Sequence, residues 1–487
     1  MSTLASYLMG DAVVQWTLTI SLMLFAMGVG SRLSKGISEN LLEAFIYAEL
    51  ALSLLTACSA LLVYTLAAFV QAIGPIIYGI ALALGLLIGL EMPLATRINE
   101  RFETLRINIS SIMEKDYYGA LLGGLLFAFV ALPYLGLTYT PIILGMTNLA
   151  AAAVLYLRFR HQVRGRRWFK LAFTLVPVFL VLLAWFAKPI LFFGEQRQYR
   201  DKVVYAEQTP YQRIVITRWK NDHWLFLNSN LQFSSYDESR YHESLVHPAM
   251  GLPPQTKRVL ILGGGDGLAA REILKHKEVE DILLVDLDPA MTKLAMSNDI
   301  LVTLNQNSLA DPKVRVINQD ALRFIAESDQ LFDLIYIDLP DPKSVDLSRL
   351  YALDFYHLVS QHLSRGGVMV TQATSPFFSR EAFLCIWKTL QATELPTVGY
   401  QTHIPTMGQW GWVLTCNDPD LTGETLKKAL MNLEFKDVQT KYLNHDALVG
   451  MLQFGKDTLD PMPGININTF QSLRLVDYYQ KGRWDMY

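Results

Sequence analysis

The sequence has few of the residues that a disulfide framework or a structural zinc site needs. Only three cysteines, Cys58, Cys385 and Cys416, occur among its 487 residues, with no Cys-x-x-Cys pair and no Cys/His ligand spacing. The net charge is −3 and no sizeable basic segment occurs, which argues against a nucleic-acid partner. The N-terminus lacks a basic region followed by a small-residue cleavage site, so we expect no removable signal peptide.

Charged residues are also scarce, at 18% of the chain against 51% hydrophobic residues, whereas soluble enzymes usually carry more charge. The hydrophobic excess lies before Gly194. Six apolar stretches there are each long enough to cross a hydrocarbon core of roughly 30 Å at about 1.5 Å per residue. We therefore predict a multi-pass transmembrane bundle over residues 1–193, with spans near 13–30, 42–70, 74–95, 118–137, 139–158 and 168–193.

Basic residues in the connections are unevenly distributed. Lysine or arginine follows the first, third and fifth stretches, whereas the connections near Gln71 and Thr138 contain neither. The positive-inside rule places the basic connections in the cytoplasm and, with six spans, everything after Gly194 outside. Glu91 ends an apolar run, either as a functional intramembrane carboxylate or at the interface beside Arg97.

After Gly194 the pattern is that of a soluble protein. Strand-like segments at 211–219 and 223–228 predict a small antiparallel sheet within residues 194–250, followed by a helix from Glu238 to Met250. Residues 251–487 then alternate strands with helices, which favours a doubly wound parallel sheet and an α/β methyltransferase-like Rossmann domain. Its strands are predicted at 258–262, 282–286, 314–318, 332–338 and 367–373, with a closing hairpin of 398–403 and 411–416. The tail from Leu421 is predicted to be helical at first and then irregular, and we assign it no chemistry.

The turn after the first strand of this domain reads Gly263-Gly264-Gly265-Asp266-Gly267. Glycines such as Gly263 and Gly265 at a strand-to-helix turn let the backbone approach a bound nucleoside, although they can also serve only to pack a helix on a sheet. Asp286, about 20 residues further on, ends the next strand, where a carboxylate reaches ribose hydroxyls.

Asp320 and Asp338 end the third and fourth strands, so these acids should converge on one crevice. Each alone could be a helix cap or a solvated loop acid. Asp266 would repel the pyrophosphate of a dinucleotide and attract a cationic ligand, by about 4 kcal/mol at 4 Å and an effective dielectric near 20.

Several short motifs occur in a shared order over roughly residues 200–420. Together they resemble the spermidine synthase (polyamine aminopropyltransferase) family, and the apolar front end resembles its membrane-fused bacterial branch. The motifs are Tyr211-Gln212, Leu227-Asn228 with Gln232, Asp237-Glu238 with Tyr241-His242-Glu243 and His247-Pro248, the glycine turn, and Asp338-Leu339-Pro340-Asp341-Pro342.

The resemblance implies transfer of an aminopropyl group from decarboxylated S-adenosylmethionine, as co-substrate, to putrescine or a related amine, with no metal and no permanently bound cofactor. On the donor side, Asp286 would bind the ribose, Asp320 and Ala321 the adenine region, and Asp266 and Gln232 the aminopropyl tail. Gln212 would also face the nucleoside pocket. On the amine side the resemblance implies Tyr241, His242, Asp338 and Asp341.

The chemistry of the reaction supports a carboxylate on the amine side. An alkylamine with a pKa near 10.4 is protonated at pH 7, and exposing its lone pair costs about 4–5 kcal/mol. We expect Asp338 to accept that proton as the catalytic base, with Asp341 holding the distal ammonium and Tyr241 assisting by a hydrogen bond. We also expect a homo-oligomer in a bacterial inner membrane. The outside position given by the charge rule conflicts with substrates made in the cytosol, so the side of the catalytic domain is open.

Two departures from the family pattern leave the acceptor open between putrescine, agmatine, cadaverine and spermidine. Lys343-Ser344-Val345-Asp346 stands where soluble members have a small polar residue and Gly-Pro-Ala, and an amine-side tyrosine near Ile404-Pro405-Thr406 is missing. Two other functions remain as alternatives. One is a methyltransferase using intact S-adenosylmethionine, whose carboxylate would clash with Asp266. The other is a membrane polyamine sensor or transporter.

Overall fold

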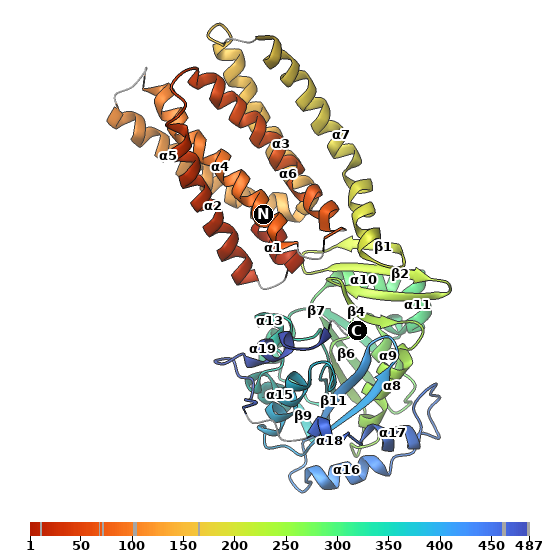
Figure 1. The fold of residues 1–487 in the computed structure, drawn as a ribbon. Helices are drawn as coiled ribbons and strands as arrows, with labels where there is room; N and C mark the ends of the chain where they lie inside the picture. Colours follow the sequence, from red (N-terminus) through yellow and green to blue (C-terminus); the bar gives the residue numbers. More distant parts are fainter. Residues whose placement is uncertain are drawn as a thin grey trace. The chain divides into compact units, whose positions relative to one another are not determined.

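The computed structural model describes residues 1–9, 12–67, 69–70, 73–100, 105–163, 166–459 and 464–484. The chain divides into two compact units, Met1–Val203 and Val204–Tyr487. Figure 1 shows that the first unit is built of long helices and the second of sheets covered by helices. These described ranges leave out residues 71–72, 101–104 and 164–165, so the predicted connection at Gln71 and the basic residues Arg101 and Arg164 lie outside the described residues.

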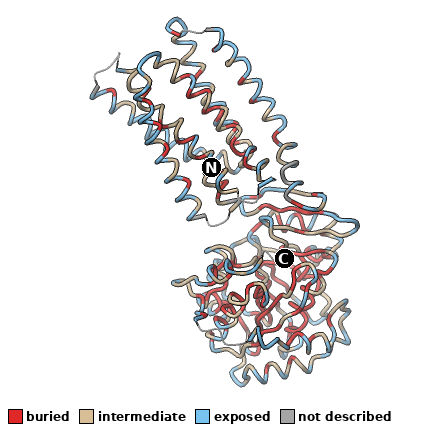
Figure 2. The backbone as a smooth tube through the Cα atoms, viewed as in Figure 1, coloured by how far each residue is buried: buried red, intermediate tan, exposed pale blue. Residues whose placement is uncertain are grey.

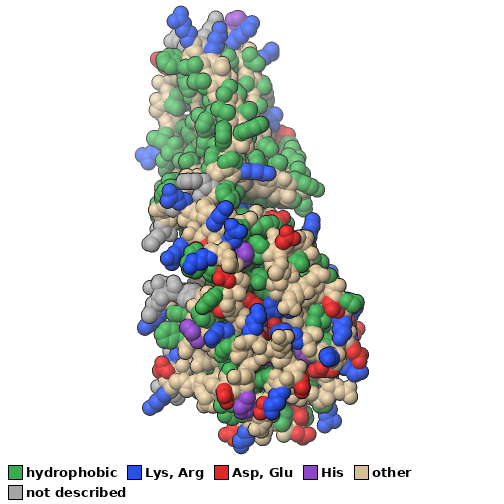
Figure 3. All heavy atoms as spheres, turned by 90° about the vertical axis from the view of Figure 1, so that its right-hand side faces the viewer, with side chains coloured by type: hydrophobic (Ala, Val, Ile, Leu, Met, Phe, Trp, Pro, Cys, Tyr) green, Lys and Arg blue, Asp and Glu red, His purple; other side chains and the backbone are tan. Residues whose placement is uncertain are grey.

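The helical unit contains α1 to α7 and one π-helical segment, η1. Their bounds are Ser2–Met9, Ala12–Ser34, Leu41–Ala67, Gly74–Asn99, Leu105–Leu126, Leu132–Phe159 and Arg166–Gln198 for α1 to α7, and Phe127–Ala131 for η1. Among the described residues, five helical segments are long and apolar enough to cross a membrane. Figure 3 shows hydrophobic side chains over the visible face of this unit, with Lys and Arg side chains gathered at one end.

Glycines allow α2 and α4 to pack closely. A Cβ on Gly30 would lie 2.1 Å from the carbonyl oxygen of Leu86, and one on Gly89 would lie 2.1 Å from that of Met27. The two helices therefore approach at backbone distance, as small residues permit in apolar bundles. A similar approach brings α6 to α3, where a Cβ on Gly145 would meet the backbone of Ser53 at 2.5 Å.

The stretches predicted at 118–137 and 139–158 are joined without the loop expected near Thr138. Both lie in one described helical run, Arg106–Phe159, in which two helices meet across a kink. Gly136 interrupts the helical geometry with φ 64° and ψ −173°. The hydroxyl of Thr140 donates to the carbonyl oxygens of Gly136 at 2.6 Å and Ala131 at 3.2 Å, so carbonyls at this kink keep hydrogen bonds.

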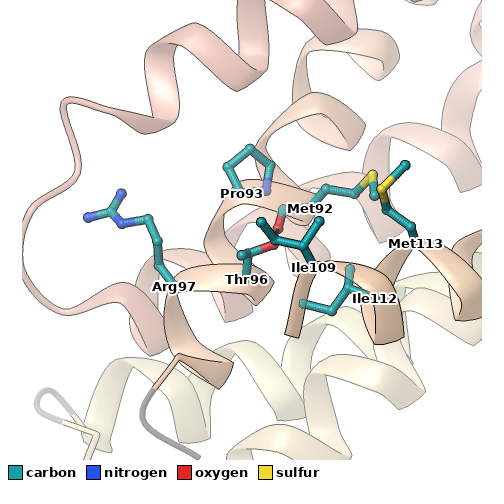
Figure 4. Close-up of a pocket in the computed structure, with 7 residues that line it drawn as sticks. All are labelled: Met92, Pro93, Thr96, Arg97, Ile109, Ile112 and Met113. Atoms are coloured by element: carbon teal, nitrogen blue, oxygen red, sulfur yellow. Dashed lines mark hydrogen bonds between the residues drawn. The ribbon is translucent and has the colours of Figure 1, made fainter. Parts of the chain in front are cut away.

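Arg97 has a structural partner other than Glu91. Its guanidinium donates to the carbonyl oxygens of Ser34 at 2.9 Å and Ile37 at 2.5 Å, and so caps the C-terminal end of α2. Within the described residues no ion pair joins Arg97 to Glu91. A shallow pocket of about 380 Å³ lies between α4 and α5, and Figure 4 shows its lining. The lining contains no acid and none of the predicted site residues: it consists of Met92, Pro93, Thr96, Arg97, Ile109, Ile112 and Met113.

The second unit begins with the small antiparallel sheet that the sequence predicts. Four strands pair in the order β1-β2-β3-β4, with bounds Lys202–Gln208, Arg213–Trp219, Asp222–Leu227 and Asn230–Ser234. The sequence indicated only the middle two of these strands. The helix α8 follows at Glu238–Met250, as predicted. Helix α7 continues past Gly194 to Gln198 before the first strand begins.

The Rossmann-like sheet has seven strands in the order β10-β11-β9-β8-β5-β6-β7. The bounds are Arg258–Gly263, Asp281–Asp286, Val314–Asn318, Phe332–Asp338, Leu363–Gln372, Thr397–Ile404 and Gly408–Cys416 for β5 to β11. All pairs among β5 to β9 are parallel, and β11 pairs antiparallel with both β9 and β10. The strands predicted from the sequence match these within a few residues, and the closing hairpin is present.

Alternate residues of the strands fill two cores, one on each face of this sheet. Val259 and Ile261 of β5 belong to one cluster, which also contains residues of α8 and of α9, Leu268–Ile273. Leu260 and Leu262 belong to the other, with residues of α12, Ala321–Glu327, and α15, Arg380–Gln391. Figure 2 shows the buried residues concentrated in the interior of this unit. Burial on both faces explains why the strands read as continuous apolar runs.

The tail after Leu421 is more regular than predicted. It contains the helices α16, α17, α18 and α19, at Gly423–Met431, His445–Met451, Lys456–Leu459 and Arg474–Gln480. Leu475 of α19 is fully buried in the second core, and α19 packs on α15. These helices are too short to give a clear periodic pattern, which is why the sequence did not reveal them.

Candidate active site

The register of the central strands brings the glycine turn between two aspartates. Gly263, at the end of β5, pairs with Asp338 at the end of β8. On the other side of β5, Leu262 pairs with Val285, the residue before Asp286. The carboxyl ends of three adjacent parallel strands therefore meet at one edge of the sheet, which is where α/β proteins bind ligands.

The glycines of the turn are required by space and by backbone conformation. Gly263 has φ 88°, and a Cβ there would lie 2.1 Å from the backbone oxygen of Asp338. A Cβ on Gly265 would lie 2.5 Å from Oδ2 of Asp286. Gly267 has φ 82° and is the N-cap residue of α9. The turn is therefore fitted against both flanking aspartates.

Asp286 is held by backbone donors. Its Oδ2 accepts from the N–H of Gly265 at 3.1 Å, and its Oδ1 from the N–H of Asp288 at 2.9 Å. Burial raises the pKa of Asp286 to about 6, with the charge of Asp266 adding to the effect and these two hydrogen bonds opposing it. The amide of Gln212 donates to Asp288 at 3.0 Å, which positions Gln212 beside this group.

Asp266 lies within electrostatic range of both other aspartates. Its Oδ1 accepts from the N–H of Leu268 at 2.8 Å in the first turn of α9. Burial raises the pKa of Asp266, and the imidazole of His242 is the largest of the influences that lower it. The negative charge of Asp266 in turn contributes to the raised pKa values of Asp286 and Asp338. A cation bound among the three acids would relieve this repulsion.

A short hydrogen bond joins Asp338, on the other side of the turn, to Tyr241. The Tyr241 hydroxyl donates to Oδ1 of Asp338 at 2.6 Å. Burial raises the pKa of Asp338 to about 6, with Asp266 contributing, while His242 and the Tyr241 hydrogen bond oppose the rise. The Tyr241 ring packs edge-on against Trp412 of β11 at 5.4 Å between centroids. Asp338 thus combines the position and the raised pKa of a general base.

His242 lies beside Tyr241 and is anchored by α8 itself. Its Nδ1 is 3.0 Å from Oε2 of Glu238, and the Glu238 carboxylate also accepts from the guanidinium of Arg271 at 2.8 and 2.9 Å. Burial lowers the pKa of His242, but the hydrogen bond and charge of Glu238 outweigh it, so the net pKa is raised. The charges of Asp266 and Asp338 also favour the protonated imidazole, so His242 lies between Glu238 and these two acids as a group that they stabilise when it is charged.

Glu243, the third residue of the Tyr241-His242-Glu243 motif, points to a different part of the unit. It is fully buried, and its carboxylate accepts from the backbone N–H groups of Lys441, Tyr442 and Leu443 at 2.7, 2.8 and 2.8 Å. Glu243 therefore fastens the segment before α17 to α8.

Asp341 has partners that the sequence did not suggest. Its Oδ2 accepts from the hydroxyl of Tyr479 at 2.7 Å, and its Oδ1 from the amide of Gln372 at 3.2 Å. Burial raises the pKa of Asp341, opposed first by the charge of Lys343. Gln372 ends β9, so the strand-end pattern could have revealed it, but nothing in the sequence marked Tyr479 in the tail. The assignment of no chemistry to the tail therefore missed a residue of the site.

The remaining predicted residues have more ordinary surroundings. Asp320 is exposed and accepts from the N–H of Arg323 at 2.8 Å as the N-cap of α12, with Ala321 buried behind it. The amide of Gln232 donates to the carbonyl oxygen of Asn230 in β4. Neither residue contacts the acids through a hydrogen bond in the described part of the chain.

The loop where an amine-side tyrosine was expected is tied to α8. Thr406 donates from both its backbone N–H and its hydroxyl to Asp237, at 2.7 and 2.8 Å. Met407 and Trp410 are almost fully buried. Among the described residues no cluster of three or more His, Cys, Asp or Glu side chains has the arrangement to hold a metal ion.

Three carboxylates around a glycine turn, with a hydrogen-bonded tyrosine and a neighbouring imidazole, define a Rossmann-like group-transfer enzyme that uses a nucleoside substrate. A family model described as the spermine/spermidine synthase domain matches residues 238–448. The polyamine aminopropyltransferase of Oceanobacillus iheyensis is 37% identical, over 99% of this chain and 94% of that protein. That of Leptospira interrogans is 39% identical, over 98% of this chain and 94% of its own length. The chain belongs to the polyamine aminopropyltransferase family, as the sequence motifs indicated.

The chain is also similar to a solved structure of spermidine synthase from Thermotoga maritima. The two are 26% identical, with a TM-score of 0.47, over 54% of this chain and 88% of that one.

Proposed function

We propose that this enzyme transfers the aminopropyl group of decarboxylated S-adenosylmethionine to putrescine or a related amine, giving spermidine and methylthioadenosine. The observation that carries the proposal is the gathering of Asp266, Asp286 and Asp338 at one edge of the sheet, where the charge of Asp266 raises the pKa of each of the other two. Such a set of acids favours a donor that brings positive charge and disfavours one that brings a carboxylate.

On the donor side, Asp286 binds the ribose hydroxyls. It is suited to this because two backbone N–H groups fix its carboxylate, and Gly265 leaves the space in front of it open. Asp266 faces the aminopropyl tail, with Gln232 as the second predicted contact there. Gln212, Asp320 and Ala321 complete the nucleoside side.

On the acceptor side, Asp338 acts as the base and Asp341 binds the distal ammonium. The acceptor nitrogen attacks the carbon bonded to the sulfonium; a C–N bond forms, the C–S bond breaks, and its electron pair neutralises the sulfur. The proton lost by the nitrogen passes to Asp338, whose pKa of about 6 keeps it mostly ionised at neutral pH. Tyr241 holds the Asp338 carboxylate in position, and His242 balances the negative charge of the site.

The test is product analysis with the purified full-length protein. Incubation with decarboxylated S-adenosylmethionine and a panel of amines should release methylthioadenosine, and Asp338→Asn should abolish most of that release. The same assay with intact S-adenosylmethionine should give neither a methylated amine nor S-adenosylhomocysteine. Methyl transfer, or an Asp338→Asn variant as active as the wild type, would overturn the proposal.

We further propose that residues 1–193 are a multi-pass domain in the bacterial inner membrane, and that residues 194–250 and 251–487 form the two parts of the catalytic unit. The length and apolar composition of five helical segments support the membrane location. A homo-oligomer stays a prediction. Reporter fusions at Gly36 and immediately after Gln208 test the topology. Activity of a cytoplasmic reporter at the second site would place the catalytic unit with its cytosolic substrates, and activity of a periplasmic reporter would favour the charge rule.

A further inference from the structure

The C-terminal helix α19 contributes a side chain to the acidic end of the amine side. Tyr479 is only 5% exposed, and its hydroxyl donates to Asp341 at 2.7 Å across 138 positions of sequence. Tyr479 lies outside residues 238–448, which the family model matches. Helix α19 is held in place by Leu475 in the core and by its packing against α15 and α13, Val345–Arg349. A segment beyond the family domain therefore completes the surroundings of Asp341.

A lysine lies against the ring of the same tyrosine. The Nζ of Lys343 is 5.6 Å from the centre of the Tyr479 ring, a cation–π distance, and it donates a hydrogen bond to the side-chain oxygen of Asn230 in β4. Within the described residues no carboxylate lies within ion-pair distance of Lys343. Its positive charge therefore acts on the surroundings of Asp341, and the carboxylate of Asp341 is the nearby charge that acts on it in turn. Burial lowers the pKa of Lys343, and the nearby charge of Asp341 opposes that change.

We propose that Lys343 and Tyr479 close the distal end of the amine site and select the acceptor by its charge, admitting a diamine and rejecting a triamine. The inference rests on the proposed function, in which Asp341 binds the distal ammonium. Tyr479 and Gln372 each donate to one oxygen of Asp341, so the carboxylate has a fixed orientation and keeps lone pairs for one further cation. A second ammonium further along the acceptor would meet the charge of Lys343, and like charges in a partly buried site repel strongly.

The experiment compares acceptors in the purified full-length enzyme. Release of methylthioadenosine from decarboxylated S-adenosylmethionine is measured with putrescine and with spermidine as acceptors. The wild type should prefer putrescine in kcat/KM, and Lys343→Gln should reduce that preference by about tenfold or more. Lys343→Arg keeps the charge and should keep the preference. Tyr479→Phe should raise the KM for putrescine about 5- to 10-fold with kcat changed by less than about twofold, because the lost hydrogen bond acts far from the reacting nitrogen.

The same helix offers matched controls. Lys481 lies 5.8 Å from the centre of the Tyr478 ring, and the Tyr478 hydroxyl donates to the carbonyl oxygen of Gly464 at 3.1 Å. Lys481→Gln and Tyr478→Phe remove similar groups from α19 outside the site, so both should keep the wild-type preference and KM.

The outcomes separate this inference from the function on which it rests. If the wild type uses putrescine and Lys343→Gln keeps its preference over spermidine, the inference is overturned and the proposed function stands. If the wild type releases no methylthioadenosine with either amine, the proposed function is overturned, and the inference with it. Lys343→Met, which has no charge and similar length, serves as the second variant if Lys343→Gln does not fold, and the same loss of preference is expected.

Discussion

The backbone N–H of Gly265 donates to Oδ2 of Asp286 at 3.1 Å, and a Cβ on Gly265 would lie 2.5 Å from that same oxygen. The glycine thus both orients the carboxylate and leaves space beside it. The two residues come from neighbouring strand ends, and their fit places the turn after β5 at the centre of the proposed donor side.

Gly265→Ala should weaken donor binding. The added methyl group must displace either the turn or the Asp286 carboxylate, because the 2.5 Å separation is far below a normal contact. We expect the KM for decarboxylated S-adenosylmethionine to rise about tenfold or more, with a smaller change in the KM for the amine, measured by steady-state kinetics. Gly450→Ala is the control, since a Cβ there meets no atom within 4 Å and α17 tolerates alanine. An unchanged donor KM in Gly265→Ala would contradict the assignment of Asp286.

Asp338→Asn and Tyr241→Phe should lower kcat to different extents. Removing the base should cost about 10²- to 10⁴-fold, whereas removing the hydrogen bond that positions it should cost about tenfold. Single-turnover measurements with both substrates bound would separate this loss from binding. Asp346→Asn, at an exposed position in the first turn of α13, is the control and should leave kcat unchanged. Equal losses in Asp346→Asn and Asp338→Asn would show that the effect is not specific to the base.

The rate should fall on the acidic side of about pH 6. The pKa of Asp338 is raised to about 6, so below that pH the carboxyl is protonated and can no longer take a proton from the amine. At saturation with both substrates, kcat should decrease about tenfold per pH unit well below pH 6. Donor affinity should weaken over a similar range because Asp286 also has a pKa of about 6. A kcat that stays constant from pH 5 to pH 7 would rule out Asp338 as a base with this pKa.

The same raised pKa predicts that the site costs stability at neutral pH. The folded protein holds the Asp338 proton up to about pH 6, whereas an unfolded aspartate loses it near 3.9. Stability from this group therefore falls as pH rises from about 4 to about 6, and the penalty is complete above that range. Asp338→Asn should raise the unfolding free energy at pH 7.5 by up to about 3 kcal/mol, seen as a higher Tm, and the gain should shrink as pH approaches 4. A Tm difference independent of pH would contradict this account.

Glu243→Gln should loosen the segment before α17. The fully buried carboxylate accepts three backbone N–H groups, and a glutamine amide would turn its own N–H groups toward some of them. We expect a loss of about 2–4 kcal/mol in unfolding free energy and faster proteolysis around residues 433–444. Limited proteolysis of the full chain measures this directly. Glu424→Gln, at an exposed helix start, should behave as the wild type.

Much of the catalytic unit follows from local sequence signals. Strands such as Val314–Asn318 and Phe332–Asp338 were predicted with their observed bounds because apolar runs end there in polar residues. Parallel pairing of these strands then brings Asp286 and Asp338 to the same edge of the sheet. The position of the candidate site could therefore be predicted from the sequence. The way in which two helices meet at Gly136 without a loop could not be predicted, because a glycine in an apolar stretch is compatible with either a loop or a kink.

The parts that the sequence did not reveal depend on contacts between distant segments. Tyr479 reaches Asp341 because α19 packs on the face of the sheet that α12 and α15 also cover. No short sequence motif predicts that packing. For Asp320 the sequence signal was ambiguous. An aspartate at a strand end can bind a ligand, but it is also a normal N-cap of the following helix, which is what Asp320 is in the structure. The sequence thus predicted that Asp320 follows a strand, but it did not predict which groups Asp320 or Tyr479 contacts.

Gly263 and Gly265 are glycines for different reasons. This difference predicts which of the two a relative that has lost its activity would keep. Gly263 faces the backbone oxygen of Asp338, so any protein that keeps these two strands paired must keep that glycine, whatever it binds. Gly265 faces a carboxylate, and loses its constraint when Asp286 is replaced. A pseudoenzyme descended from this fold would therefore retain the first glycine long after the second had drifted, so Gly265 paired with Asp286 is the better marker of retained activity.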